Sequence, residues 1–110
     1  MNSPNQRRAQ IEAMLVDEPQ DRFLRYCLAV EMHADGDTPA ALEKFLELCR
    51  DEPPHVAAFF RRGQLLVELD RIEEARSVLR EGIETARNQG DLHAAGEMSE
   101  LLAELGQWGE

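Results

Sequence analysis

The sequence is poor in aromatic and basic side chains, and each shortage excludes a class of protein. Only 5% of the 110 residues are aromatic, so we expect a helical core filled with Leu, Ala, Val and Ile. The chain has 12 Lys and Arg residues against 22 Asp and Glu residues, which gives a net charge of −10. Because an acidic surface repels phosphate groups, we expect no nucleic-acid partner and no binding to anionic membranes.

Long apolar runs and a cysteine framework are also lacking. No stretch of about 18 apolar residues occurs, so no membrane-spanning helix is expected. Residues 1–8 lead into no apolar run, and we therefore expect no secretory signal and a cytoplasmic protein. The two cysteines, Cys27 and Cys49, occupy apolar helix positions and are interpreted as reduced core thiols. A Cys27–Cys49 disulfide is the alternative.

The most informative pattern in the chain is an internal repeat, in which the tripeptide Asp17-Glu18-Pro19 recurs as Asp51-Glu52-Pro53. A period of about 34 residues is typical of helix–turn–helix repeats that stack into a solenoid. The same shift matches small residues with small ones and large apolar residues with large ones, namely Tyr26 with Phe60, Ala29 with Gly63, Met32 with Leu66, Ala41 with Ala75, Phe45 with Leu79 and Cys49 with Ile83.

Caps and apolar periodicity predict six helices and no strand. Ser3 and Asp91 are expected to cap helix N-termini, and Asp70 is expected to form a capping box with Glu73. Gly106 is expected to end the last helix, so that Trp108 is either a disordered tail residue or a plug folded onto the stack. The expected helices span about residues 4–16, 21–34, 38–52, 53–69, 71–89 and 92–105.

Two sets of residues, one repeat period apart, follow one consensus pattern. The first set is Arg25-x2-Leu28-Ala29-x2-Met32, then Ala41-x3-Phe45, then Pro53. The second set is Phe59-x2-Arg62-Gly63-x2-Leu66, then Ala75-x3-Leu79, with Arg87 in place of the closing proline. Both sets resemble the W-x2-L-G-x2-Y, A-x3-F, P pattern of the tetratricopeptide repeat family, and the chain is similar to its short stand-alone bacterial members.

This resemblance implies an all-α fold, a right-handed α-solenoid of antiparallel helix hairpins with about six helices. The chain is expected to form a single domain over residues 1–110. Its expected parts are a half repeat over 3–19, full repeats over 20–53 and 54–89, and a capping helix over 91–105. Neighbouring hairpins must stack because one hairpin cannot bury its apolar face alone.

The resemblance also implies that the first helix of each hairpin lines a concave groove. The favoured function is a non-catalytic module that binds a peptide or helix of a protein partner there. Two alternatives are that these residues are covered core or that the same surface forms a homodimer. Family members that clamp peptide C-termini use Lys, Asn and Arg on the inner helices, and the residues here are unsuited to this. The residues expected to line the groove are Phe23, Tyr26, Val30, His33, Phe60, Gln64, Val67, Met98 and Leu101.

Catalytic and metal-binding patterns are not visible, so we expect no enzymatic activity, no cofactor and no metal. The three histidines, His33, His55 and His93, lie on separate elements without metal-ligand spacing and are interpreted as surface or cap residues. The pairs Arg7-Arg8 and Arg61-Arg62 are interpreted as solvated helix charges. For Arg61 the alternative is an ion pair with an acidic residue of a partner.

Overall fold

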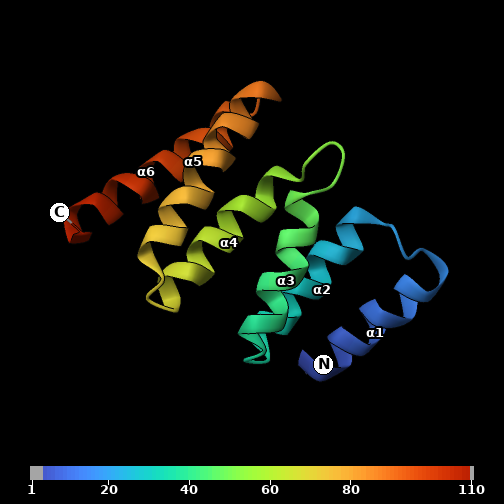
Figure 1. Ribbon diagram of the computed structural model, residues 1–110. Helices are drawn as coiled ribbons and strands as arrows, with labels where there is room; N and C mark the ends of the chain where they lie inside the picture. Colours follow the sequence, from blue (N-terminus) through green and yellow to red (C-terminus); the bar gives the residue numbers. More distant parts are fainter. Residues whose placement is uncertain (1–3, 110) are drawn as a thin grey trace.

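The computed structural model describes residues 4–109, which form six α-helices and no strand (Figure 1). This is the all-α arrangement that the repeat pattern predicts, whereas the expected cap Ser3 lies outside the described residues. None of the helices within residues 4–109 is both long and apolar enough to cross a membrane. The helices are α1 (Pro4–Asp17), α2 (Arg22–Ala34), α3 (Thr38–Cys49), α4 (Val56–Glu68), α5 (Ile72–Asn88) and α6 (Leu92–Gly109).

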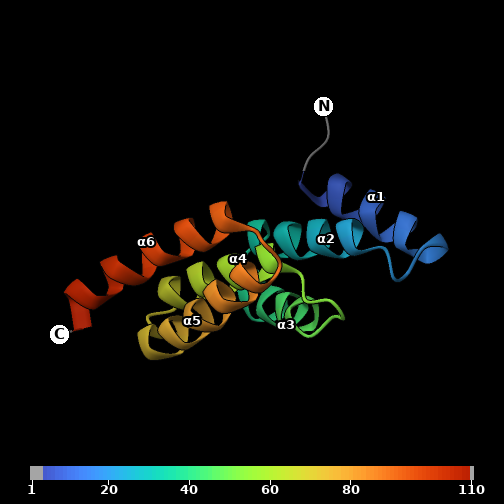
Figure 2. The same ribbon diagram turned by 90° about the horizontal axis from the view of Figure 1, so that it is seen from above.

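Each helix packs mainly against its neighbours in the chain, as expected for a stack of hairpins. The helices α2 and α3 form one hairpin and α4 and α5 form the next, while α1 packs on α2 and α6 packs on α5. Seen from above, α3 and α5 lie along one side of the stack, away from α1 and α6 (Figure 2). The helix α4 also contacts α6, and this contact places α2, α4 and α6 around a common surface.

The core extends along the stack between the hairpins. Ala29, Ala41 and Ala75 have no exposed surface, and their small side chains allow the paired helices to approach closely. These are the small residues that the repeat pattern aligns. The largest fully buried side chains are Phe45, Leu48, Leu65, Leu66, Leu79, Met98 and Leu105.

The second copy of the repeated tripeptide anchors the loop between α3 and α4. The Asp51 carboxylate accepts two hydrogen bonds from the Arg25 guanidinium, at 2.7 and 3.1 Å. These bonds hold the pKa of Asp51 below its ordinary value. Arg22 donates a further hydrogen bond to the Pro53 carbonyl at 2.6 Å. Because Arg22 and Arg25 belong to α2, they tie this loop to the first hairpin.

The turn between α4 and α5 differs from the sequence prediction, because Asp70 does not cap α5. Asp70 has a φ of 61°, in the left-handed region, and it is the repeat equivalent of Gly36, whose φ is 87°. A left-handed residue commonly ends a helix, and both residues follow the C-terminus of the first helix of a hairpin. The residue before α5 is Arg71, which makes no side-chain cap and instead pairs with Glu74 at 2.7 Å.

Three further helix ends can be compared with the prediction. Asp91 caps α6 as expected, because its carboxylate accepts a hydrogen bond from the Ala94 amide at 3.1 Å. The start predicted for α4 at Pro53 is wrong, since Pro53 and Pro54 lie in the loop that precedes Val56. The end predicted at Gly106 is also wrong: α6 continues to Gly109 because Gly106 does not adopt the positive φ that stops a helix. The backbone of Trp108 is therefore helical.

Ion pairs attach α1 to the first hairpin. Arg7 lies 3.1 Å from the Glu31 carboxylate, and Arg8 lies 3.3 Å from Asp35 and 3.4 Å from Asp37. The interpretation of Arg7 and Arg8 as merely solvated charges is thus wrong. Both arginines reach α2 or the turn that follows it, because α1 packs directly on α2.

Candidate functional site

An open groove lies between α2, α4 and α6, and we call it the inner groove. Its wider part has a volume of about 470 Å³ and contains Tyr26 of α2 together with residues of α4 and the first turn of α6. A second hollow of about 240 Å³ continues it along α6. Phe60 and Gln64 of α4 and Glu97 of α6 line both hollows, so they lie at the centre of the inner groove.

The residues predicted for a concave groove are divided by the structure. Tyr26, Phe60, Gln64 and Leu101 line the inner groove. Their role in binding a partner stays a prediction. The residues that do not line either hollow are Phe23, which is 71% exposed, Val30 and Val67, which pack partly buried against the core, and His33, which lies 2.8 Å from Glu68.

Met98 is a core residue, and the prediction that it lines the groove is wrong. Its side chain has no exposed surface. A Cβ atom added at Gly82 would lie 2.6 Å from the Met98 sulfur, so Met98 packs directly on α5. The prediction continued the repeat period from Gln64 to Met98. The spacing lengthens there, because α4 begins 34 residues after α2 whereas α6 begins 36 residues after α4. Met98 is therefore the equivalent of Leu28, which is also buried in the core, and not of Gln64.

The Tyr26 side chain connects the inner groove to the core. Its ring packs edge-on against Phe45, with centroids 5.7 Å apart, and lies 5.2 Å from the His55 ring. Burial lowers the pKa of His55. The Tyr26 hydroxyl accepts a hydrogen bond from Arg61 Nε at 3.0 Å, so Arg61 is held on the groove wall rather than freely solvated.

The two walls of the inner groove differ in charge. The α4 wall contributes Phe60 and the shorter apolar side chains of Val56 and Ala57. The α6 wall contributes carboxylates spaced three and four residues apart on one helix face, namely Glu97, Glu100 and Glu104. No group of three metal-binding side chains comes together within residues 4–109. The inner groove therefore combines an acidic α6 wall with a mainly apolar α4 wall that also carries Arg61.

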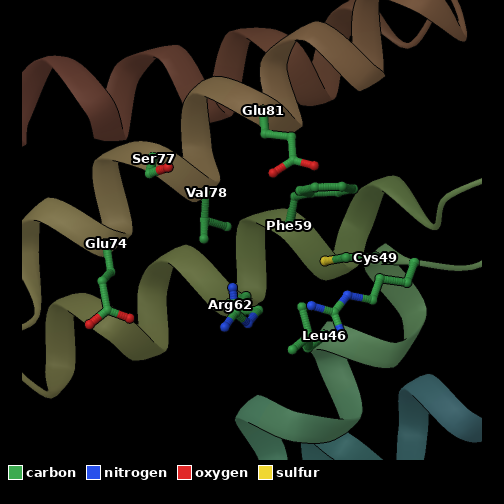
Figure 3. A pocket seen from close by; sticks show the side chains of 9 residues that line it. Leu46, Cys49, Phe59, Arg62, Glu74, Ser77, Val78 and Glu81 are labelled. Carbon is green, nitrogen blue, oxygen red and sulfur yellow. The ribbon is translucent and has the colours of Figure 1, made fainter.

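A second pocket, which we call the outer pocket, lies between α3, α4 and α5 and has a volume of about 380 Å³. The α3 residues are Leu46 and Cys49, joined by Arg50 just after the helix. Phe59 and Arg62 come from α4, and Figure 3 shows them between the α3 residues and those of α5. The α5 residues are Glu74, Ser77, Val78 and Glu81.

The polar groups of the outer pocket include a buried thiol and an arginine nitrogen without a hydrogen-bond partner among the described residues. Both cysteines of the chain are free thiols, as the reduced interpretation predicts. Burial raises the pKa of Cys49 to about 12, so this thiol stays protonated and is a poor nucleophile. The Nε atom of Arg62 is buried and has no hydrogen-bond partner among residues 4–109. Arg62 thus differs from Arg61, whose Nε is bound to Tyr26.

The outer pocket was not predicted from the sequence, although one signal pointed to it. Arg62 lies one repeat period after Leu28 and occupies the position of the pattern leucine. Leu28 is 8% exposed, which shows that this position faces the interior in the first repeat. A charged residue at a buried repeat position is unusual. The interpretation of Arg61 and Arg62 as solvated charges did not distinguish Arg62, which stands at a buried repeat position, from its neighbour Arg61.

Comparisons with known proteins find similar solved structures for most of the chain. No family model matches the sequence, and no curated protein matches it. The chain is similar to the solution NMR structure of a tetratricopeptide repeat domain protein from Salinibacter ruber, with 32% identity and a TM-score of 0.75 over 79% of this chain and 88% of that one. A crystal structure of a tetratricopeptide repeat domain protein from the same organism gives 31% identity and a TM-score of 0.72 over 78% of this chain and 97% of that one.

Proposed function

The chain belongs to the tetratricopeptide repeat family, and from this we propose that it is a non-catalytic interaction module that binds a protein segment in the inner groove. The observation that supports this most strongly is the pair of adjoining hollows that share Phe60 and Gln64. Phe60 is only partly buried, so a large apolar side chain remains available at the centre of the groove.

The chemistry of the walls supports a proposal for the kind of partner. An apolar side chain of the partner would pack on Phe60 and Leu101. Basic side chains on the same segment would face Glu97, Glu100 and Glu104. Electrostatic complementarity of this kind chiefly sets specificity and association rate. We therefore propose a basic, amphipathic peptide or helix, whose capture weakens as the ionic strength rises.

Replacing Phe60 with glutamate tests this proposal. The Phe60→Glu protein should keep its helical circular dichroism, because Phe60 is not fully buried. It should lose partner capture, because the new carboxylate must be desolvated when the interface closes and adds to the acidic wall. The measurement is pull-down from cells of the native organism, followed by competition with a synthetic peptide from the captured partner.

Two further variants show whether the effect belongs to the inner groove. Phe23→Glu makes the same substitution at an exposed aromatic residue of α2 outside both hollows, and should leave stability and capture intact. Gln64→Lys changes an exposed residue at the groove centre, and should weaken capture of a basic segment without loss of stability. Gross unfolding of Phe60→Glu, or equal loss of capture in Phe23→Glu, would refute the groove assignment.

Homodimerisation through the same surface is the alternative function. The partly buried Phe60 and Leu101, which line the inner groove, would be available to such a contact. A solution mass twice the 12.5 kDa of one chain would favour it. In that case Phe60→Glu should convert the dimer to a monomer, whereas a monomeric wild-type chain favours the interaction module.

A further inference from the structure

We propose that the outer pocket binds a small organic monocarboxylate, with Arg62 and Arg50 holding its carboxylate and Phe59 and Val78 contacting its apolar body. This site is separate from the inner groove and does not depend on the function proposed for it. The pocket is built from three helices of successive hairpins, whose packing fixes its position.

The first argument is the unmatched donor of Arg62. Its Nε atom is buried without a hydrogen-bond partner among the residues that the structure describes. A buried donor without an acceptor is destabilising, so such groups are rare in folded proteins. The equivalent residue of the first repeat, Leu28, shows that an apolar side chain suits this position. A ligand that supplies an acceptor accounts for the arginine.

The second argument concerns the competing carboxylates of the pocket. Glu74 is engaged by Arg71, whose Nε and Nη2 donate hydrogen bonds to its two oxygens at 3.0 and 2.7 Å. No hydrogen bond joins Glu74 to Arg62, whose Nε atom has no partner among the described residues. Glu81 forms no ion pair with Arg62 or Arg50 among the described residues. The two arginines thus share one pocket, and neither forms a hydrogen bond or ion pair with a carboxylate among the described residues.

The third argument selects the class of anion. The pocket contains two arginines and two glutamates, so a dianion such as phosphate would face repulsion from Glu74 and Glu81. A single carboxylate matches the planar guanidinium in a bidentate contact. The remaining lining consists of the apolar Leu46, Phe59 and Val78 together with Cys49 and Ser77, and the volume of about 380 Å³ suits a short aliphatic or aromatic body.

The experiment titrates the full chain, labelled with ¹⁵N, with hexanoate and monitors the Arg62 Nε–H signal and the backbone amides of the pocket. Saturable shifts confined to the outer pocket are expected, with a dissociation constant on the order of 1 mM for so small a ligand. Hexanamide and inorganic phosphate should give no such shifts. Equal shifts from hexanamide, or no saturable shift from hexanoate, would overturn the proposal.

Matched variants distinguish specific binding in the outer pocket from non-specific attraction of the anion to positive charge. Arg62→Leu restores the residue type of the repeat pattern, so it should melt at a higher temperature than the wild type and bind hexanoate at least about tenfold more weakly. Arg80→Leu removes the same charge from an exposed position of α5 outside the pocket and should bind normally. Equal weakening in both variants would contradict the assignment.

Two final experiments test the effect of Glu81 on binding and the source of the bound carboxylate. Glu81→Gln should strengthen hexanoate binding, because it removes a competing charge from the pocket. Unchanged binding in Glu81→Gln together with full binding in Arg62→Leu would refute the proposed contacts. A capped peptide with one glutamate between two leucines is titrated in parallel with hexanoate. Tighter binding of the peptide would indicate a carboxylate from a protein side chain, and tighter binding of hexanoate would indicate a free acid.

Discussion

A chain that ends at Gly90 is expected to lose most of its stability, because α6 covers the apolar face of α5. The α6 residues Ala95, Met98 and Leu105 are at most 5% exposed. Burial of a Met or Leu side chain contributes roughly 1.5–3 kcal/mol, so the loss should be on the order of 5 kcal/mol. Small domains are stable by only about 5–15 kcal/mol. Thermal and urea unfolding, followed by circular dichroism, measure the change.

Arg76 makes this truncation more costly. It is 5% exposed, and its Nη2 donates a hydrogen bond to the Leu105 carbonyl at 2.7 Å. Without α6, the guanidinium keeps only its ion pair with Glu73. A chain that ends at Gly106 retains Leu105 and serves as the control, with stability close to that of the full chain. A cooperative transition at the wild-type temperature in the chain that ends at Gly90 would refute the covering role of α6.

Side chains at the two buried helix glycines are expected to disrupt the packing of α5. A Cβ at Gly82 would lie 2.6 Å from Phe59 Cβ, an atom fixed to the α4 backbone. Gly82→Ala should therefore lower the free energy of unfolding by roughly 1–3 kcal/mol, despite the better helix propensity of alanine. A Cβ at Gly63 would meet the more mobile end of Leu79 at 2.7 Å, so Gly63→Ala should cost less and Gly63→Leu more.

Gly96 provides the matched control for these glycines. It lies within α6, and a Cβ there would have no neighbour within 4 Å. Gly96→Ala should stabilise the protein by about 0.5–1 kcal/mol, because it only lowers the backbone freedom of the unfolded chain. Urea unfolding of these variants gives the comparison. If Gly82→Ala were as stable as Gly96→Ala, the close approach of α5 to α4 and α6 would be wrong.

The hairpins are well predicted from the sequence because the same pattern of small and large apolar residues occurs in both repeats. Ala41 and Ala75 share one small-residue position, and both are fully buried. The turn chemistry was harder to predict, since Asp at a cap and Asp in a left-handed turn have the same local sequence signature. The repeat alignment of Asp70 with Gly36 indicates the left-handed turn, whereas Glu73 three residues later indicates a capping box.

The candidate surfaces were less predictable than the fold. Tyr26 and Phe60, one repeat period apart on the first helices of their hairpins, both line the inner groove, and their role in binding stays a prediction. The 34-residue period misplaced Met98, because α6 begins 36 residues after α4 and this shift moves Met98 to a buried repeat position. The outer pocket depends on how side chains of three helices meet, which no single-helix pattern records. For the outer pocket, the informative sequence feature is that Arg62 replaces the leucine of the repeat consensus.

Site-specific photo-crosslinking in the native cell shows whether a protein segment occupies the inner groove. A photoreactive amino acid at exposed Gln64 lies at the centre of the groove, while the same group at exposed Arg80 lies outside it. If the groove is the binding site, Gln64 should give adducts with one protein partner, competed by an excess of the unlabelled chain, and Arg80 should give none. Equal adducts at both positions, or adducts at Arg80 alone, would contradict the proposed function.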